Sequence, residues 1–201
     1  MGILYNKKLL TTRNTKTEEV FEGLFGDVTF EQLPYSSPLD YISQYWNEFE
    51  KVSNATNSLI GNMWECVINS LLYREGLLPF YRQAKVAFVP NVNFDIILYT
   101  RSFPINISLK TSLRERYKQA DLEAIALKYV HRRAKSFLLT LESEEAKSCK
   151  EKIKTGEIIG LDGIVDCNTC EVNDLFCELH KIKDEFTESN QVDVVTGILI
   201  K

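Results

Sequence analysis

The chain has 201 residues, of which 44% are hydrophobic and 26% charged, and its net charge at pH 7 is −4. This is an ordinary globular composition, with enough length for one domain and a real core. No apolar run is long enough to span a membrane, and the first ten residues lack the apolar core and cleavage site of a signal peptide. Five cysteines at irregular spacing argue against a disulfide framework and for a reducing compartment. We therefore expect a cytoplasmic protein without a membrane partner.

The first 53 residues are predicted to form a helical N-terminal region. Residues 17–25 could form one short helix. Ser37 and Pro38 are typical of a second helix start, because serine caps the N-terminus and proline suits the first helical position. This helix should reach about Val52. The sequence leaves open whether the region serves dimer contact or DNA clamping.

A longer helix is predicted from about Thr56 to Arg74, with an apolar stripe at helical spacing. Glu65 lies off this stripe, in a segment that is otherwise uncharged. Residues 87–90 (AFVP) are predicted as a short strand that ends at proline.

Two strands with alternating polarity follow, at 94–99 and 105–110, and residues 101–104 make a hairpin connection between them. If the strands pair, Asp95 and Lys110 project from the same edge of the sheet. A carboxylate beside an ammonium group suits a metal-assisted attack on phosphate. The carboxylate binds a hard divalent cation, and the lysine orients water and stabilises developing charge.

These residues resemble the PD-(D/E)xK nucleases. The pattern is most similar to the branch of type II restriction endonucleases in which serine, here Ser108, replaces the acidic residue two positions before the lysine. In that branch the missing carboxylate comes from the following helix. The family spacing is a lysine, an arginine six residues later and a glutamate seven beyond, which Lys110, Arg116 and Glu123 match. One departure is Phe94, which stands before Asp95 where the family often has proline.

The residues themselves support a displaced carboxylate. A divalent ion that bridges a scissile phosphate needs more than one carboxylate, and Ser108 is a poor substitute for one. On a predicted helix from about Leu113 to Val130, Arg116 and Glu123 lie two turns apart and share a face. The alternative is an arginine and a glutamate on a solvated helix face.

The resemblance implies an α/β (α+β) fold, with a mixed central β-sheet flanked by helices, as in restriction endonucleases. It implies Mg²⁺ as cofactor, held by Asp95 and Glu123 with help from Glu65, for which a structural ion pair is the alternative. The implied catalytic residues are Asp95, Ser108, Lys110, Arg116 and Glu123.

The partner implied by the resemblance is double-stranded DNA with a short palindromic site. The branch uses an arginine-glutamate pair after the lysine to read C:G pairs, and Arg114 and Glu115 match it. Guanine accepts from arginine in the major groove and cytosine N4 donates to glutamate. A palindrome is most simply read by a two-fold dimer, so we expect a homodimer.

Charge distribution supports a nucleic-acid partner. Residues 110–135 hold eight Lys or Arg against three acids, a local net charge of +5 that leaves −9 for the rest of the chain. Basic side chains near the catalytic edge would bind phosphates and release counterions. We assign Lys118, Arg132 and Arg133 to this role. The alternative is a solvated helix face.

The C-terminal part is predicted to complete the sheet. A strand at 134–141 follows a helix, which implies a parallel crossover. A helix at 143–154, a strand at 158–165, a helix at 173–186 and a strand at 192–200 come next. We expect a single endonuclease domain, with a catalytic core at 54–141 and its completion at 142–201.

One cluster offers a different chemistry. Cys167, Cys170, Cys177 and His180 lie within fourteen residues and could hold a structural zinc. The spacing between the two pairs is short for a zinc knuckle, and such residues are often simply buried. Two other function classes therefore stay open, namely a structure-specific or repair nuclease of the same superfamily, and a non-catalytic DNA-binding protein with a zinc.

Overall fold

The computed structural model describes residues 2–10, 15–189 and 194–201. It divides the chain into two compact units, Met1–Gly76 and Leu77–Lys201, which are described one at a time. Within the described residues, no helix has the length and apolar character that crossing a membrane requires.

The N-terminal unit is helical, as predicted. Its helices are α1 (Ile3–Asn6), α2 (Lys16–Gly23), α3 (Pro38–Phe49) and α4 (Asn57–Arg74). Thr15, Ser37 and Thr56 cap the last three, since each side chain accepts from a backbone N–H three residues later. The single turn α1 is the one helix here that the sequence pattern did not predict.

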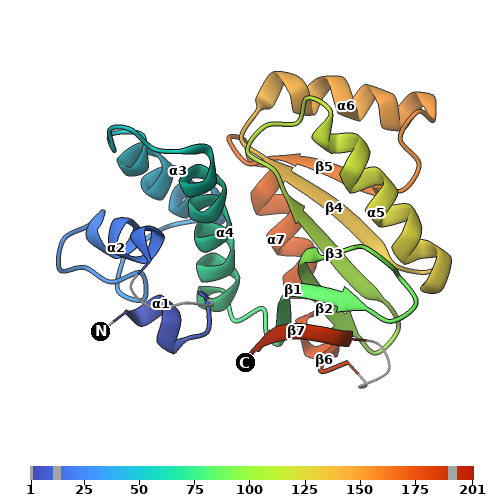
Figure 1. Cartoon of the computed structure of the whole chain (residues 1–201), viewed down its shortest axis with the longest axis horizontal. Helices are drawn as coiled ribbons and strands as arrows, with labels where there is room; N and C mark the ends of the chain where they lie inside the picture. Colours follow the sequence, from blue (N-terminus) through green and yellow to red (C-terminus); the bar gives the residue numbers. More distant parts are fainter. Residues whose placement is uncertain (1, 11–14, 190–193) are drawn as a thin grey trace. The chain divides into compact units, whose positions relative to one another are not determined.

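The C-terminal unit is built on a mixed sheet in the order β5-β4-β3-β2-β1-β7, with β6 paired to β2 (Figure 1). β2 and β3 form the predicted antiparallel hairpin, and β3-β4 and β4-β5 pair in parallel, which confirms the predicted crossover. The strands are β1 (Phe80–Val86), β2 (Phe94–Thr100), β3 (Pro104–Leu109), β4 (Lys135–Thr140), β5 (Gly163–Asp166), β6 (Phe186–Thr187) and β7 (Val194–Ile200).

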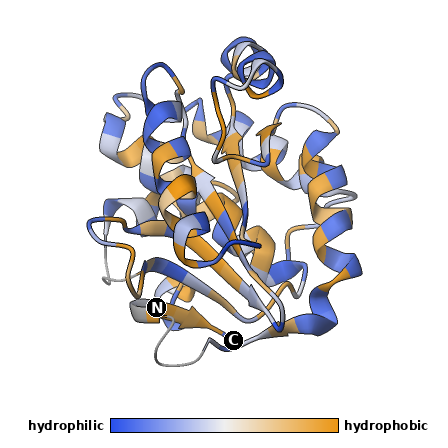
Figure 2. Ribbon diagram, turned by 90° about the vertical axis from the view of Figure 1, so that its right-hand side faces the viewer, coloured by the Kyte–Doolittle hydropathy of each residue, from blue (hydrophilic) through white to orange (hydrophobic). Residues whose placement is uncertain are grey.

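Three helices flank this sheet: α5 (Arg116–Val130), α6 (Ser143–Thr155) and α7 (Glu171–Lys181). α5 and α7 lie on opposite faces (Figure 1). Leu127 of α5 packs in one apolar cluster with Ile97 and Tyr99, and Ala124 packs in another with Leu138. The long strands are hydrophobic, whereas the helices alternate between hydrophobic and hydrophilic residues (Figure 2). The predicted fold class is confirmed.

Some predicted boundaries were wrong. Residues 87–89 form a turn, and the strand lies earlier, at β1. Phe88 has a φ of 62°, a left-handed conformation that departs from regular extended backbone. β1 is held by antiparallel pairing with both β2 and β7, which sequence periodicity does not reveal. The strand predicted at 158–165 begins only at Gly163, where β5 starts.

The C-terminal helix was also predicted too late. α7 begins at Glu171, with Cys170 at the N-cap position, and ends at Lys181 rather than at 186. The first two residues of the strand predicted at 192–200 lie outside the described residues, and β7 accounts for the rest. α4, which we assigned to the catalytic core, belongs to the N-terminal unit.

Gly160 holds α5 close to the sheet. Its N–H donates to Asp121 Oδ1 at 2.6 Å, and the N–H of Leu161 donates to the same oxygen at 3.2 Å. A Cβ at position 160 would lie 2.4 Å from the backbone oxygen of Asp121, so the helix and this segment can approach only through glycine.

We expect Gly160→Ala to lower the free energy of unfolding by about 1–3 kcal/mol, because the added methyl group overpacks against the α5 backbone. Denaturant unfolding would measure this. The control is Gly61→Ala in α4, where a Cβ meets open space, and which should be neutral or stabilising by about 0.5–1 kcal/mol. Equal stability of the two variants would contradict the packing.

Candidate active site

Asp95 and Lys110 meet at one edge of the sheet, as predicted. Lys110 Nζ lies 2.9 Å from Asp95 Oδ2. The same oxygen accepts from the backbone N–H of Leu109 at 2.8 Å and lies 3.5 Å from Ser108 Oγ. The side chains of Lys110 and Asp95 are only 11% and 16% exposed, so solvent screens this ion pair weakly.

The strand register produces this meeting. Ile96 pairs with Ile107, which sets Asp95 beside Ser108 on the adjacent strand and on the same face. Lys110 follows β3 directly, and its N–H donates to the backbone oxygen of Leu139 in β4 at 3.1 Å. The lysine backbone is therefore held by the sheet, which leaves its side chain to reach back to Asp95.

Glu123 brings a second carboxylate from α5. Burial raises the pKa of this carboxyl above its ordinary value, and the charge of Asp95 raises it further. The hydrogen bond from Gln119 and the charge of Lys110 act in the opposite direction. Glu123 therefore interacts electrostatically with both members of the Asp95–Lys110 pair.

Gln119 orients Glu123, a role that our sequence analysis missed. Its Nε2 donates to Glu123 Oε1 at 2.7 Å. The two residues lie four apart on α5, a spacing at which side chains of a helix meet, so the signal was present in the sequence. Arg116, which the resemblance implies as a catalytic residue, would either support Glu123 or contact phosphate. Arg116 is exposed at the start of α5, and among the described residues no ion pair joins it to Glu123.

The donor set fits a hard divalent cation. Within the part of the chain that the structure describes, Asp95 Oδ1 and Glu123 Oε2 accept no hydrogen bond, so each carboxylate retains an oxygen for a metal. No three His, Cys, Asp or Glu side chains gather into a metal cluster among those residues. Mg²⁺ is commonly held by one or two carboxylates together with water and substrate phosphate, so two carboxylates suffice.

Two other predictions concern residues outside the Asp95–Glu123 pair. Glu65 is half-buried on α4 of the N-terminal unit, and its approach to the metal stays a prediction. The four proposed zinc ligands do not form a metal cluster. Cys167 is buried, and burial raises the pKa of its thiol, whereas Cys170 and Cys177 are exposed.

The segment between β3 and α5 presents Arg114 and Glu115, the residues predicted to read DNA bases. Both are exposed. Arg114 has a φ of 26°, a strained backbone for a residue with a side chain. Glu145 of α6 holds this segment, since its Oε2 accepts from the N–H groups of Leu113 at 2.6 Å and Arg114 at 3.2 Å. Our sequence analysis did not single out Glu145.

Glu115 is paired in this conformation. Its carboxylate forms an ion pair with Lys118, and a hydrogen bond from that lysine lowers the pKa of Glu115. The Glu115 side chain is 80% exposed, so the pair is a solvated surface contact that a DNA base could replace at small cost.

The basic region 110–135 is not one continuous patch. Lys128 and Lys135 both form ion pairs with Asp162, at 2.8 and 3.3 Å, so one carboxylate offsets part of their charge. Arg132 and Arg133 follow the C-terminal end of α5, whereas Arg114 precedes its N-terminal end. A helix of this length separates its two ends by about 22 Å. The basic side chains therefore lie at two places.

The comparisons with known proteins agree with the sheet and its flanking helices. A solved structure described as a complex of the restriction endonuclease PspGI with substrate DNA matches 85% of this chain and 94% of its own, with a TM-score of 0.54. The fold is that of a restriction endonuclease. Sequence identity is 15%, so this likeness concerns the fold. No protein-family model and no curated protein matches the chain.

Proposed function

We propose that the protein is a Mg²⁺-dependent type II restriction endonuclease that hydrolyses phosphodiester bonds of double-stranded DNA at a short palindromic site. The observation that carries this proposal is the Asp95–Lys110 pair at a sheet edge, with the Glu123 carboxylate acting on both. The restriction-endonuclease-like fold supports the proposal, because the PD-(D/E)xK pattern that Asp95, Ser108 and Lys110 resemble belongs to nucleases of this kind.

Each side chain then has a chemical role. Asp95 and Glu123 would hold Mg²⁺, which supplies Lewis-acid stabilisation of the charge that develops on the scissile phosphate. Lys110 positions the attacking water and stabilises that charge. Gln119 orients Glu123, and Ser108 lies against Asp95. The family resemblance implies products with 5′-phosphate and 3′-hydroxyl ends.

We further propose that Arg114 donates to guanine and Glu115 accepts from cytosine, which makes the site C:G-containing. The strained backbone at Arg114 and the hydrogen bond from its N–H to Glu145 support this role. A side chain that recognises a base must extend from a backbone that is held in one position. A homodimer would read both halves of the palindrome. The five cysteines of the sequence at irregular spacing favour the cytoplasmic location that we propose.

Arg114→Ala should reduce the preference for the cognate base pair and leave the catalytic residues intact. A good bidentate contact to a base is worth about 1–3 kcal/mol, so we expect the preference for the cognate C:G pair over its A:T replacement to fall roughly five- to 150-fold. Competition cleavage of two duplexes that differ at one pair would measure this. Lys147→Ala on α6 is the control, and an undiminished preference in Arg114→Ala would contradict base reading.

The function is tested by plasmid digestion with Mg²⁺ and with EDTA. Discrete fragments that require the metal would support a site-specific endonuclease, and sequencing their ends would give the site. A smear would indicate a nuclease of the same superfamily without this specificity. Intact plasmid with several DNA substrates and divalent metals would indicate a DNA-binding protein without catalysis.

A further inference from the structure

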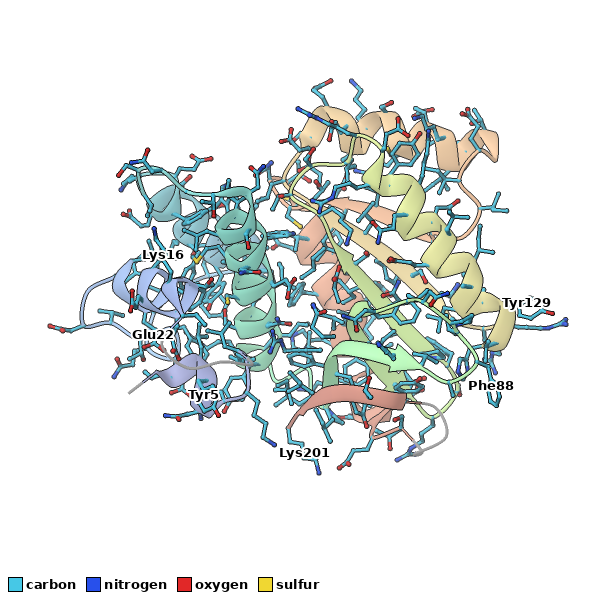
Figure 3. The ribbon with its side chains drawn as sticks, in the orientation of Figure 1. Tyr5, Lys16, Glu22, Phe88, Tyr129 and Lys201 are labelled. Carbon is cyan, nitrogen blue, oxygen red and sulfur yellow. The ribbon has the colours of Figure 1, made fainter. Side chains whose placement is uncertain are left out.

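A pocket of about 440 Å³ lies at the tip of the β2-β3 hairpin. We call it the hairpin pocket. Residues 99–104 of the hairpin form one side, and residues 131–133, between α5 and β4, form the other. Figure 3 shows Tyr129 projecting outward at the end of α5 that leads into the second segment.

The rim of the hairpin pocket is strongly basic. Arg101, Arg132 and Arg133 are exposed, and no acidic residue lines the pocket. None of the three forms an ion pair with any residue in the described ranges 2–10, 15–189 and 194–201. Three guanidinium groups around one cavity leave a positive charge that the protein does not neutralise. Guanidinium groups match the geometry of phosphate oxygens and bind them in pairs of hydrogen bonds.

The floor of the hairpin pocket is aromatic and rigid. Tyr99, Thr100 and Pro104 are buried, and the His131 ring lies edge-on to the Tyr99 ring at 6.3 Å between centroids. Thr100 Oγ1 donates to the backbone oxygen of Phe103 and accepts the N–H groups of Ser102 and Phe103. These bonds hold the hairpin in one conformation, so a ligand would meet a preformed site.

Two features bear on what the pocket binds. The C-terminal end of α5 contributes a partial negative charge of about one half, which three full positive charges outweigh. Thr100 is five residues beyond Asp95 on β2, which corresponds to about 17 Å along the strand. The hairpin pocket is therefore separate from the catalytic edge, and its arginines cannot act on the same phosphate.

We propose that the hairpin pocket binds the phosphate group of a nucleotide through its three arginines, with the base or sugar against the partly exposed His131 ring. The nucleotide is either free or part of a DNA strand that extends beyond the cleavage site. The second case rests on the proposed function and assigns the phosphate contact of Arg132 and Arg133 to this pocket, together with Arg101, whereas the first does not require nuclease activity.

The test compares Arg132→Gln/Arg133→Gln with a double control of equal charge change, Lys147→Gln/Lys183→Gln, whose lysines are exposed and lie outside the pocket. Calorimetry with inorganic phosphate and deoxynucleoside 5′-monophosphates measures free nucleotide binding. Fluorescence anisotropy with a 25-base-pair duplex in EDTA, over a salt series, measures DNA binding without cleavage. Arg101→Gln serves as an independent variant if the double change unfolds the protein.

We expect at least a tenfold loss of mononucleotide affinity in the arginine variant, or a salt slope of DNA binding reduced by about 0.9 for each phosphate contact removed. The first result alone identifies a free nucleotide, and the second alone identifies the DNA backbone. Arginine variants that match the lysine control in both measurements would overturn the proposal. Failure of the wild-type protein to cut plasmid would refute the proposed function. The binding measurements would still decide whether the hairpin pocket binds phosphate, because they do not depend on cleavage.

Discussion

Lys110→Ala is expected to reduce the single-turnover cleavage rate by about 100- to 10,000-fold while DNA binding in EDTA is retained. Lys110 Nζ is the one cationic group within hydrogen-bonding distance of Asp95 among the described residues, so no neighbour can replace it. Loss of the ammonium group removes both the orientation of water and the stabilisation of charge at the phosphate.

Rates on a cognate duplex with Mg²⁺ would measure this effect, with anisotropy for binding and thermal unfolding for stability. Lys147→Ala controls for the loss of an exposed lysine on α6 and should cleave within about threefold of wild type, because surface charges contribute little. A Lys110→Ala protein that is folded and cleaves at the control rate would exclude Lys110 from the chemistry and leave the Asp95–Lys110 pair as a structural contact.

Glu123→Gln should reduce cleavage without unfolding the protein. The amide keeps the shape of the side chain and can still accept from Gln119, but it removes the second negative charge from the site. We expect weaker Mg²⁺ binding and a fall in cleavage of about 100-fold or more, since a hard cation needs the carboxylate. Mg²⁺ should raise the melting temperature of the wild-type protein more than that of the variant.

The pH dependence of stability follows from the same carboxyl group. Because the pKa of Glu123 is raised in the folded state, the folded protein binds this proton more tightly than the unfolded chain does. Its contribution to the free energy of unfolding is therefore lost as the pH rises from the ordinary pKa of glutamate through the raised pKa. Above both values, metal-free wild type carries the full cost of a buried charge, and Glu123→Gln should be the more stable protein.

Denaturant unfolding of both proteins in EDTA over pH 3–8 would measure that difference. Gln119→Ala is a useful companion variant, since Gln119 touches Glu123 but carries no charge and should weaken cleavage less than Glu123→Gln does. Equal stability of wild type and Glu123→Gln at every pH, with equal response to Mg²⁺, would show that Glu123 belongs to a solvated face and not to the metal site.

Much of the site could be predicted from sequence because its information is local. The alternation in β2 and β3 set the side chains of Asp95 and Lys110 on one face, and the hairpin between the strands brought them together. Glu123 was predictable from helix spacing together with the family pattern. In each case the deciding residues lie on one hairpin or on the helix that follows it, where periodicity constrains which side chains can meet.

Tertiary structure decided the contacts between distant segments, for which periodicity carries no information. Glu145 reaches the N–H of Arg114 from 31 residues away, and Asp162, which precedes β5, forms an ion pair with Lys128 of α5. β1 exists at 80–86 because β2 and β7 complete its hydrogen bonds, although 87–90 has the more strand-like sequence. The sequence alone determined the β2-β3 hairpin, the pairing of Asp95 with Lys110 and the helices α3, α4 and α5. Only the tertiary structure decided which lysine and arginine side chains lack an ion-pair partner among the described residues, because this depends on which acidic side chains pack beside them.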